Sequence, residues 1–238
     1  MSVSTSREPA KIAGMFDAIA GNYDFLNHLL SAGIDKRWRR KAIRSLGLTG
    51  REHVLDLCTG TADLAIAAVD ATPGAKHVLG VDFAGEMLRV GLDKTRTRAL
   101  DRRVALVRGD AANIPAATQS VDAVTIAFGI RNVQDTQRAC DEIFRVLKPG
   151  GRFLCLEFSK VLVPVLDKLY DAYSFKVLPK MGERIAGDAD SYRYLAESIR
   201  MHPDQETLKQ MMLDAGLERV EYFNLCAGVV ALHRGYRF

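Results

Sequence analysis

Between residues 53 and 158 the sequence alternates short apolar runs with longer amphipathic segments. The apolar runs have the length of strands, and the segments between them repeat their apolar residues at helical spacing. Such alternation is typical of a parallel sheet covered by helices on both faces. The expected strands are 53–58, 77–82, 104–108, 121–128 and 152–158, and the expected helices are 61–69, 85–96 and 136–147.

The pattern changes after residue 158. Helices are expected at 164–178, 189–201 and 204–215, and strand-like runs at 218–226 and 229–234. The short separation of those two runs favours an antiparallel hairpin over another crossover. We therefore expect an α/β fold whose sheet is mostly parallel, with a C-terminal antiparallel hairpin strand and helices on both faces.

Helical spacing also extends over residues 10–47, and no strand-like run precedes residue 53. We expect residues 1–47 to form an N-terminal helical lid or extension. Residues 48–238 would then form one domain, with a helical insertion on the substrate side at about 160–202. A chain of 238 residues has the length of one α/β domain with such an extension.

The composition excludes several classes of protein. With 48% hydrophobic and 26% charged residues, the chain is too apolar for a disordered protein. Its four cysteines form no CxxC pair, which disfavours a structural zinc site and a disulfide framework. We therefore expect no metal and a cytoplasmic location. No apolar run reaches the roughly 18–20 residues that span a bilayer.

The residues around the end of the first expected strand carry the most specific chemistry. Thr59, Gly60 and Thr61 are small, so a ligand can approach backbone N–H groups at the carboxyl edge of the sheet, where parallel sheets bind ligands. Asp82 ends the second strand, where a carboxylate can accept hydrogen bonds from ribose hydroxyls. Asp110 follows the third strand, where a purine base could bind to it. The pattern predicts a nucleoside site at this edge.

Two classes of cofactor share this geometry. A dinucleotide requires a GxGxxG loop, but Gly60 is isolated and position 62 is alanine. The loop also contains Asp56 and Asp63, which would repel a pyrophosphate and suit the sulfonium and ammonium of S-adenosylmethionine. We therefore expect S-adenosylmethionine, with Asp56 and the small loop residues among its ligands. Asp63 alone is also explained as a favourable charge at a helix N-terminus.

Seven segments carry a resemblance to one family: 16–24 (FDAIAGNYD), 54–61 (VLDLCTGT), 128–133 (FGIRNV), 156–160 (LEFSK), 187–195 (GDADSYRYL), 198–203 (SIRMHP) and 230–235 (VALHRG). Together, over residues 14–238, the chain resembles the class I C-methyltransferases of ubiquinone and menaquinone biosynthesis. The resemblance implies a Rossmann-like methyltransferase fold and S-adenosylmethionine as methyl donor. It also implies a prenylated quinol as substrate, so that demethylmenaquinol, a ubiquinol precursor or both would be methylated.

The same resemblance assigns cofactor-binding positions to Thr61, Asp82, Asp110 and Ala111. The sequence departs from the family at two points. Ala62 replaces the usual glycine of the loop, and Ala127 stands where relatives commonly carry serine. The missing hydroxyl removes one hydrogen bond to the cofactor, so Ala127 is not counted among its ligands.

Methyl transfer to carbon requires a carbon nucleophile, which a quinol provides when it loses a phenolic proton and charge spreads to the ring. A phenol has a pKa of about 10, so the site must assist. Arg131 stays protonated and is a poor base. With Asn132 it can stabilise the phenolate and orient a water that takes the proton, the role that the resemblance implies for this pair. His202 is a second candidate base, although a lone histidine is more often structural.

Aromatic side chains are expected to hold the ring and its prenyl tail. Tyr23 and Tyr192 are the candidates for substrate binding, although aromatic residues at helical spacing more often belong to a core. A methyltransferase acting on amino groups of bases would carry a (D/N)PP(Y/F) loop, which is missing at 127–132, so no nucleic acid is expected as partner. A methyltransferase of another small hydrophobic substrate stays open, as does a homodimer.

The formal charge of the chain is +4, from 33 Lys and Arg against 29 Asp and Glu. Six of the positive charges lie at 35–44, beside the single tryptophan, Trp38. A solvated helix face is the simplest explanation. Because a prenylated quinol dissolves in a bilayer, this helix is also a candidate for peripheral contact with anionic lipid at the inner face of the membrane.

Overall fold

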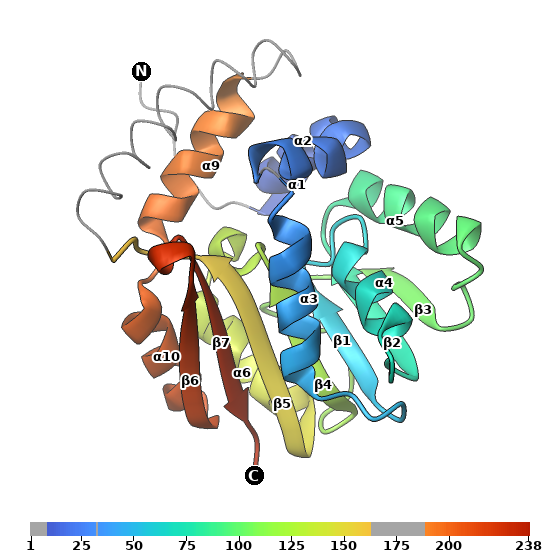
Figure 1. Ribbon diagram of the computed structural model, residues 1–238, viewed down its shortest axis with the longest axis vertical. Helices are drawn as coiled ribbons and strands as arrows, with labels where there is room; N and C mark the ends of the chain where they lie inside the picture. Colours follow the sequence, from blue (N-terminus) through green and yellow to red (C-terminus); the bar gives the residue numbers. More distant parts are fainter. Residues whose placement is uncertain (1–8, 32, 163–188) are drawn as a thin grey trace.

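A twisted, mostly parallel sheet forms the centre of the fold (Figure 1). The computed structural model describes residues 9–31, 33–162 and 189–238, and within them seven strands are ordered β3-β2-β1-β4-β5-β7-β6. Strands β1 to β5 are parallel, and β7 is antiparallel to both β5 and β6. The expected fold class is therefore confirmed. The strands are β1 His53–Leu57, β2 His77–Asp82, β3 Val104–Arg108, β4 Val121–Ala127, β5 Leu147–Phe158, β6 Glu218–Leu225 and β7 Val230–Tyr236.

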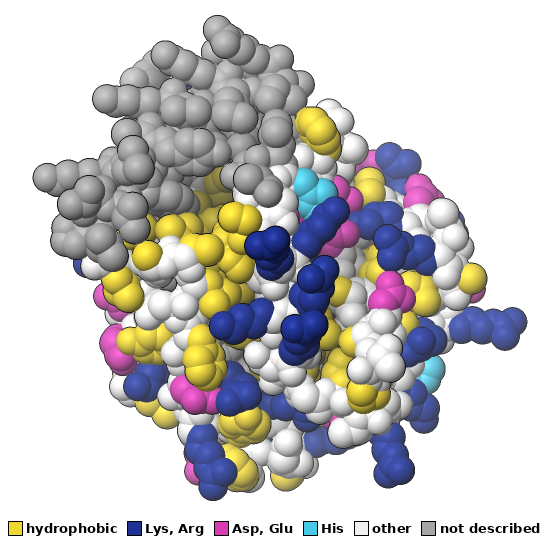
Figure 2. Space-filling model, in the orientation of Figure 1, with side chains coloured by type: hydrophobic (Ala, Val, Ile, Leu, Met, Phe, Trp, Pro, Cys, Tyr) yellow, Lys and Arg dark blue, Asp and Glu magenta, His cyan; other side chains and the backbone are white. Residues whose placement is uncertain are grey.

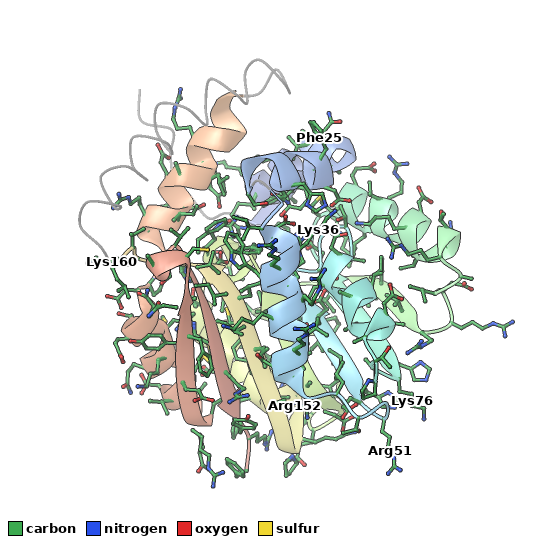
Figure 3. All side chains as sticks on the ribbon, viewed as in Figure 1. Phe25, Lys36, Arg51, Lys76, Arg152 and Lys160 are labelled. Carbon is green, nitrogen blue, oxygen red and sulfur yellow. The ribbon has the colours of Figure 1, made fainter. Side chains whose placement is uncertain are left out.

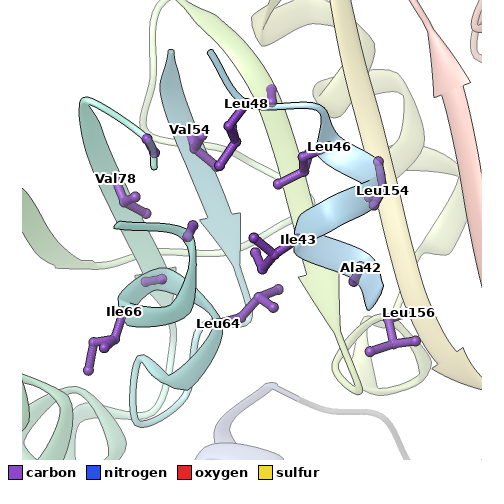
Figure 4. Packing of buried hydrophobic residues seen from close by; sticks show 14 of the residues in the cluster. Ala42, Ile43, Leu46, Leu48, Val54, Leu64, Ile66, Val78, Leu154 and Leu156 are labelled. Atoms are coloured by element: carbon purple, nitrogen blue, oxygen red, sulfur yellow. The ribbon is translucent and has the colours of Figure 1, made fainter. Parts of the chain in front are cut away.

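Helices cover both faces of the sheet. On one face α3 and α4 pack through residues such as Ile43 and Leu64, as Figure 4 shows, and on the other α6 and α10 pack through Ile143 and Leu208. The helices are α1 Pro9–Ile19, α2 Tyr23–Leu30, α3 Asp35–Leu46, α4 Asp63–Asp70, α5 Gly85–Thr97, α6 Thr136–Val146, α9 Ala189–Met201 and α10 Gln205–Asp214, with short 3₁₀ helices at η1 Ala20–Asn22, η2 Ile130–Asn132 and η4 Cys226–Gly228.

Strand β5 is buried on both faces, as a central strand of a parallel sheet must be. Phe153 belongs to the cluster under α6 and α10, whereas Leu154 belongs to the cluster under α3 and α4. The strand begins at Leu147, earlier than the expected residue 152. Leu147 pairs with Val121, and the register then shifts around Gly150, whose φ is 82°. The expected turn is therefore an irregularity inside the strand, because both of its flanks pair with β4.

The N-terminal helices lie near the carboxyl edge of the sheet, over α5 (Figure 1). Asp17 on α1 accepts a hydrogen bond from the backbone N–H of Glu86, in the first turn of α5, at 2.8 Å. Ala20 of η1 and Met87 of α5 belong to one buried cluster, between the N-terminal helices and α5. Residues 9–46 thus pack on the sheet domain through specific contacts. The helix expected at 164–178, and with it most of the insertion at 160–202, lies outside the described residues.

Candidate active site

A buried carboxylate fixes the loop that follows β1. Asp56 is 1% exposed. Its Oδ2 accepts a hydrogen bond from the Thr59 hydroxyl at 2.6 Å, and its Oδ1 accepts one from the Thr125 hydroxyl on β4 at 2.7 Å. Burial raises the pKa of Asp56 to about 6, although these two hydrogen bonds oppose the rise. The carboxylate therefore joins two strand ends at the edge where the sequence predicts the cofactor.

The same loop turns through three residues with positive φ, Cys58 with 51°, Gly60 with 56° and Ala62 with 65°. Glycine adopts this conformation without steric cost, whereas alanine does not. The position at which this chain departs from the usual glycine is thus one where glycine has a clear conformational advantage.

Asp82 joins the loop after β1 to the loop after β2. Its Oδ2 accepts a hydrogen bond from the N–H of Gly60 at 2.8 Å, and its Oδ1 accepts one from the N–H of Ala84 at 2.9 Å. Burial raises the pKa of Asp82, against the effect of these N–H groups. The residues predicted to hold the amino-acid and ribose parts of a cofactor therefore meet at one point of the sheet edge.

A cavity of about 680 Å³ opens beside the loops that follow β2, β3 and β4. Its volume lies within the range of about 300–1,000 Å³ that is typical of small-molecule sites. Asp110 is held at this cavity by a hydrogen bond from the N–H of Ala112 to its Oδ1, at 2.9 Å. The lining includes Phe83, Asp110, Ala111, Asn132, Met201 and Pro203. Two predicted cofactor residues and one predicted catalytic residue thus share one cavity.

Two cationic side chains of the protein lie against the carboxylate of Asp63. Its carboxylate forms ion pairs with Lys94 and, at 3.3 Å, with Arg39. Both cations are shared, Arg39 with Asp35 and Lys94 with Asp24, so the charge of Asp63 is only partly offset, and its expected effect on the choice of cofactor stays a prediction. Lys94 also contacts the Thr61 hydroxyl at 3.1 Å, and that hydroxyl donates to Asp24 on α2 at 2.6 Å. A predicted cofactor residue is thereby joined to the N-terminal helices.

Arg131 lies in η2 as a buried cation, 4% exposed. Its Nη1 donates hydrogen bonds to Glu157 Oε1, at 2.8 Å, and to the carbonyl oxygen of Phe128. Its Nε is buried and has no hydrogen-bond partner among the described residues. Burial is the largest single influence and lowers the pKa of Arg131, but the charge and hydrogen bond of Glu157, together with Tyr23 and Tyr194, raise it overall, so the guanidinium stays protonated. The guanidinium of Arg131 is therefore held at Nη1, while its buried Nε–H is a donor without a partner among the described residues.

Sequence reasoning assigned no role to Glu157. It lies at the carboxyl end of β5 and is 1% exposed. One sequence signal could have identified Glu157 as a site residue. It is a charged residue in an apolar strand, at the edge where parallel strands end, and a charge buried there needs a partner.

The backbone between β4 and η2 is unusually constrained. Phe128 has a φ of 58° and Cys58, at the end of β1, has a φ of 51°. A Cβ added to Gly129 would lie 2.2 Å from the Cβ of Cys58, so only glycine fits there. Sparsely populated backbone conformations concentrate at functional sites. This close approach of two strand ends places η2, and with it Arg131, at the sheet edge.

Asn132 is linked to α9 by a side chain that the sequence did not single out. Its Oδ1 accepts a hydrogen bond from the Tyr194 hydroxyl at 3.0 Å. The residue selected from the sequence, Tyr192, also lies on α9, but its side chain is outside the described part of the structure. Because residues two apart do not share a helix face, choosing between them required the packing of α9 on η2.

Two further predicted residues have distinct surroundings. Tyr23 begins α2 and packs edge-on against Phe16, with ring centroids 6.0 Å apart. Burial raises the pKa of Tyr23, and the nearby charge of Arg131 opposes the rise. His202 is buried just after α9 ends, between Met201 and Pro203, which both line the cavity. Their roles stay predictions.

Helix α3 exposes a row of cations to solvent. Figure 2 shows Lys and Arg side chains gathered over this helix. Lys36, Arg40 and Arg44 form no ion pair with any described residue and line a groove of about 830 Å³ between α3 and α4. Arg39, by contrast, is paired with two aspartates. Trp38 is 9% exposed and belongs to the core. No helix in the described ranges has the length and apolarity needed to cross a membrane.

Comparisons with known proteins bear on this site. A model of the ubiE/COQ5 methyltransferase family matches residues 4–237. A "Ubiquinone/menaquinone biosynthesis C-methyltransferase UbiE" of Enterobacter sp. (strain 638) is 49% identical over 236 residues, which cover 99% of this chain and 94% of that protein. The protein of the same name from Vibrio vulnificus (strain YJ016) is 51% identical over 237 residues, 99% of this chain and 91% of that one.

Solved structures share the fold at lower identity. A chain from the complex of the Haloferax volcanii Trm112 methyltransferase activator with a methyltransferase aligns with a TM-score of 0.67 and 21% identity, over 93% of this chain and 96% of that one. Phosphoethanolamine N-methyltransferase 2 of Haemonchus contortus, in complex with S-adenosyl-L-methionine, aligns with a TM-score of 0.62 and 16% identity, over 85% of this chain and 52% of that one.

Proposed function

The chain belongs to the ubiE/COQ5 methyltransferase family, and from this premise we propose how its site transfers a methyl group from S-adenosylmethionine to a ring carbon of a prenylated quinol. The proposed substrate is demethylmenaquinol, a ubiquinol precursor, or both; relatives at 49% and 51% identity are named ubiquinone/menaquinone biosynthesis C-methyltransferases, which supports this choice. One observation carries the proposal: a buried, permanently charged guanidinium at the sheet edge keeps its Nε without a partner among the described residues. Such a donor suits an oxygen that becomes negative during reaction.

The residues at the edge of the sheet fit the cofactor. Asp56 and Asp82 are buried carboxylates, which suit a ligand with a positive charge and hydroxyl donors. Each oxygen of Asp82 accepts one backbone N–H, which leaves a lone pair on each for a ribose hydroxyl. Asp110 and Ala111 line the cavity where a purine would bind. When bound, S-adenosylmethionine supplies an electrophilic methyl group on a sulfonium. Thr59, Gly60 and Thr61 would complete this cofactor site.

Arg131 and Asn132 would act on the substrate oxygen. The guanidinium remains charged, so it lowers the free energy of a phenolate and thereby places negative charge on the adjacent ring carbon. Asn132 lines the cavity and its Oδ1 accepts a hydrogen bond from the Tyr194 hydroxyl, and its amide N–H₂ would be the donor that orients a water or the substrate oxygen. That water, or His202, would take the phenolic proton.

The N-terminal helices and the 160–202 insertion would enclose the substrate. We propose residues 1–47 as the lid, because α2 is joined to the cofactor loop through Asp24, Thr61 and Lys94. Tyr23, near the charge of Arg131, would contact the ring, and Tyr192 would contribute from α9. Exclusion of water from such a site strengthens every electrostatic interaction within it.

Turnover tests the assignment directly. The protein, incubated with methyl-labelled S-adenosylmethionine and separately with reduced demethylmenaquinone or a reduced ubiquinone precursor, should give a quinol that has gained one labelled methyl group. Mass spectrometry of each product identifies the accepted ring. Absence of transfer to both quinols would refute the substrate assignment.

The row of cations on α3 supports peripheral contact with the inner face of the membrane that holds the substrate. Lys36, Arg40 and Arg44 would face anionic headgroups, each contributing about 1 kcal/mol near the surface. Trp38 would not insert, because it is buried in the core. Among the described residues, the exposed large hydrophobic side chain nearest this row in sequence is Ile34, 38% exposed.

Flotation with anionic vesicles tests this contact. Lys36→Gln/Arg40→Gln should reduce co-flotation and weaken its salt dependence, with Arg44 left in place. The matched control is Arg51→Gln/Lys76→Gln, which removes the same charge at the lower edge of the molecule in Figure 3, below Lys36, and should bind as the parent does. Equal loss in both pairs would reject α3 as the docking face. Sedimentation velocity of the lipid-free protein would distinguish a monomer from a homodimer. Release of the protein from the vesicles at high salt would identify it as a cytoplasmic protein that binds the membrane peripherally.

A further inference from the structure

Glu157 is the most deeply buried charged residue that the proposed mechanism does not use. It is the penultimate residue of β5, 1% exposed, between Leu156 and Phe158. Its Oε1 accepts hydrogen bonds from Arg131 Nη1, at 2.8 Å, and from the N–H of Phe158, at 2.9 Å. Its Oε2 is 3.4 Å from the backbone nitrogen of Arg131, which donates to it. The carboxylate thus binds both the side chain and the backbone of Arg131.

These contacts fix how the guanidinium lies. Nη1 is held by Glu157 and by the Phe128 carbonyl, and the guanidinium carbon lies 5.5 Å from the centroid of the Phe158 ring. A guanidinium is planar and rigid, so restraining one nitrogen and one face also fixes the direction of the others. The buried Nε, unpartnered among the described residues, is therefore presented in one orientation.

Glu157 also determines the net charge that Arg131 presents. An isolated buried cation is costly, and a buried partner of opposite charge offsets most of that cost. Burial raises the pKa of Glu157, and the charge of Arg131 opposes the rise. With both groups ionised the pair is neutral, so a phenolate beside it experiences a dipole rather than a full positive charge.

We propose that Glu157 is a positioning residue for methyl transfer, which orients the free donor edge of Arg131 toward the substrate oxygen and sets the charge that this oxygen experiences. The inference rests on the proposed function, because it needs a substrate oxygen that becomes negative. It differs from a purely structural role, since a structural ion pair would stabilise the fold without changing how the reaction depends on pH.

The variants Glu157→Gln and Glu157→Ala separate orientation from charge. Glutamine can keep the hydrogen bond to Nη1 through its carbonyl oxygen but loses the negative charge. We expect it to retain most of kcat and to move the ascending limb of the kcat–pH profile to lower pH by about one unit, because removal of a nearby anion favours the phenolate. Alanine loses both functions, and kcat should fall at least about tenfold while the Kd of the cofactor changes less than about twofold.

A matched control exists on α6, where the side chain of Glu142 is 12% exposed. Glu142 forms a similar pair with Arg145, at 2.7 Å, on α6 and away from the catalytic pair. Glu142→Gln should leave both kcat and the pH limb unchanged. A shift of the limb in this variant as well would show that the effect is general to the protein charge, and the proposal would be overturned.

A double-mutant cycle covers the case in which Glu157→Ala fails to fold. Arg131→Gln/Glu157→Gln removes both buried charges together, so neither is left unpaired. Arg131→Gln removes the cation that opposes the burial-driven rise in the pKa of Glu157, so in that background we expect Glu157 to be protonated and to carry no charge. Adding Glu157→Gln to Arg131→Gln should then change neither the residual kcat nor the pH limb. An unmoved limb in the Glu157→Gln single variant, or equal effects of Glu157→Gln in both backgrounds, would refute the proposal. An inactive parent protein would instead refute the proposed function.

Discussion

Replacing Asp56 with asparagine should make the protein more stable at neutral and alkaline pH. The side chain is 1% exposed, and burial raises its pKa to about 6 from an ordinary value of 3.8. Both of its hydrogen-bond donors are threonine hydroxyls. A hydroxyl can rotate to accept as well as donate, so Asp56→Asn would keep a partner on each side while removing the buried charge.

The size of the effect follows from the pKa. A carboxyl whose pKa is higher in the folded than in the unfolded protein stabilises the fold when protonated, and that contribution is lost as the pH rises through the folded value. The interval between 3.8 and about 6, at about 1.4 kcal/mol per pH unit, amounts to about 3 kcal/mol. Asp56→Asn should therefore be more stable than the parent by about 3 kcal/mol at pH 8, about half of that at pH 5 and about 0.5 kcal/mol at pH 4.

Urea unfolding at several pH values measures this difference, with the single buried tryptophan, Trp38, as the fluorescent reporter. Glu52 provides a control of opposite sign. Burial works against its charge, but hydrogen bonds from Thr49 and neighbouring N–H groups outweigh it and lower the pKa of Glu52 to about 2. Its stabilisation is present above pH 4.5 and is lost as the pH falls toward 2, so Glu52→Gln should lose stability at pH 8.

A parent protein that is as stable as Asp56→Asn at pH 8, or an advantage of the variant that does not shrink on acidification, would refute the reasoning. Either result would mean that hydrogen bonds from the two threonines fully offset the free energy of burying the ionised Asp56 carboxylate. The variant should at the same time bind S-adenosylmethionine more weakly, because the charge that destabilises the fold is one that a cationic ligand uses.

Three more substitutions test the site. Arg131→Ala should lower kcat at least about a hundredfold while the cofactor Kd, from calorimetry, stays within about twofold; parallel losses would indicate a structural role. Asp82→Ala should weaken cofactor binding at least about tenfold, since two ribose hydrogen bonds and the Gly60 contact are lost, and an unchanged titration would contradict the ribose assignment. Tyr194→Phe leaves the Asn132 oxygen without its 3.0 Å donor, so kcat/KM should fall by a factor that corresponds to about 1 kcal/mol. Full activity of this variant would show that the contact between α9 and Asn132 has no part in the reaction.

The arrangement of the sheet was largely predictable because apolar runs and turns are local signals. The expected bounds of β2 and β3, at 77–82 and 104–108, coincide with the structure. Strand β5 was predicted to start too late, since Pro149 and the glycines after it resemble a loop unless their pairing with β4 is known. The meeting of Asp56 and Asp82 at one edge also followed from the topology alone.

The partners of the site residues could not be predicted in the same way, because they depend on packing between elements. Asp63 forms ion pairs with Lys94, which lies on α5, and with Arg39, which lies on α3, and no local signal in the sequence indicated either partner. Glu157 lies 26 residues after Arg131, and only the parallel pairing of β4 with β5 brings them together. Distance along the chain carries no information on such contacts.

The position of the transferred methyl group tests the central claim most directly. Methyl-labelled S-adenosylmethionine, reduced demethylmenaquinone and the parent protein should give a product whose label lies on a ring carbon beside a phenolic oxygen, as located by carbon NMR. The same reaction with Arg131→Ala should give little product, all of it labelled at the same carbon. Label on oxygen, or undiminished ring methylation by Arg131→Ala, would contradict a mechanism in which this buried guanidinium stabilises the phenolate.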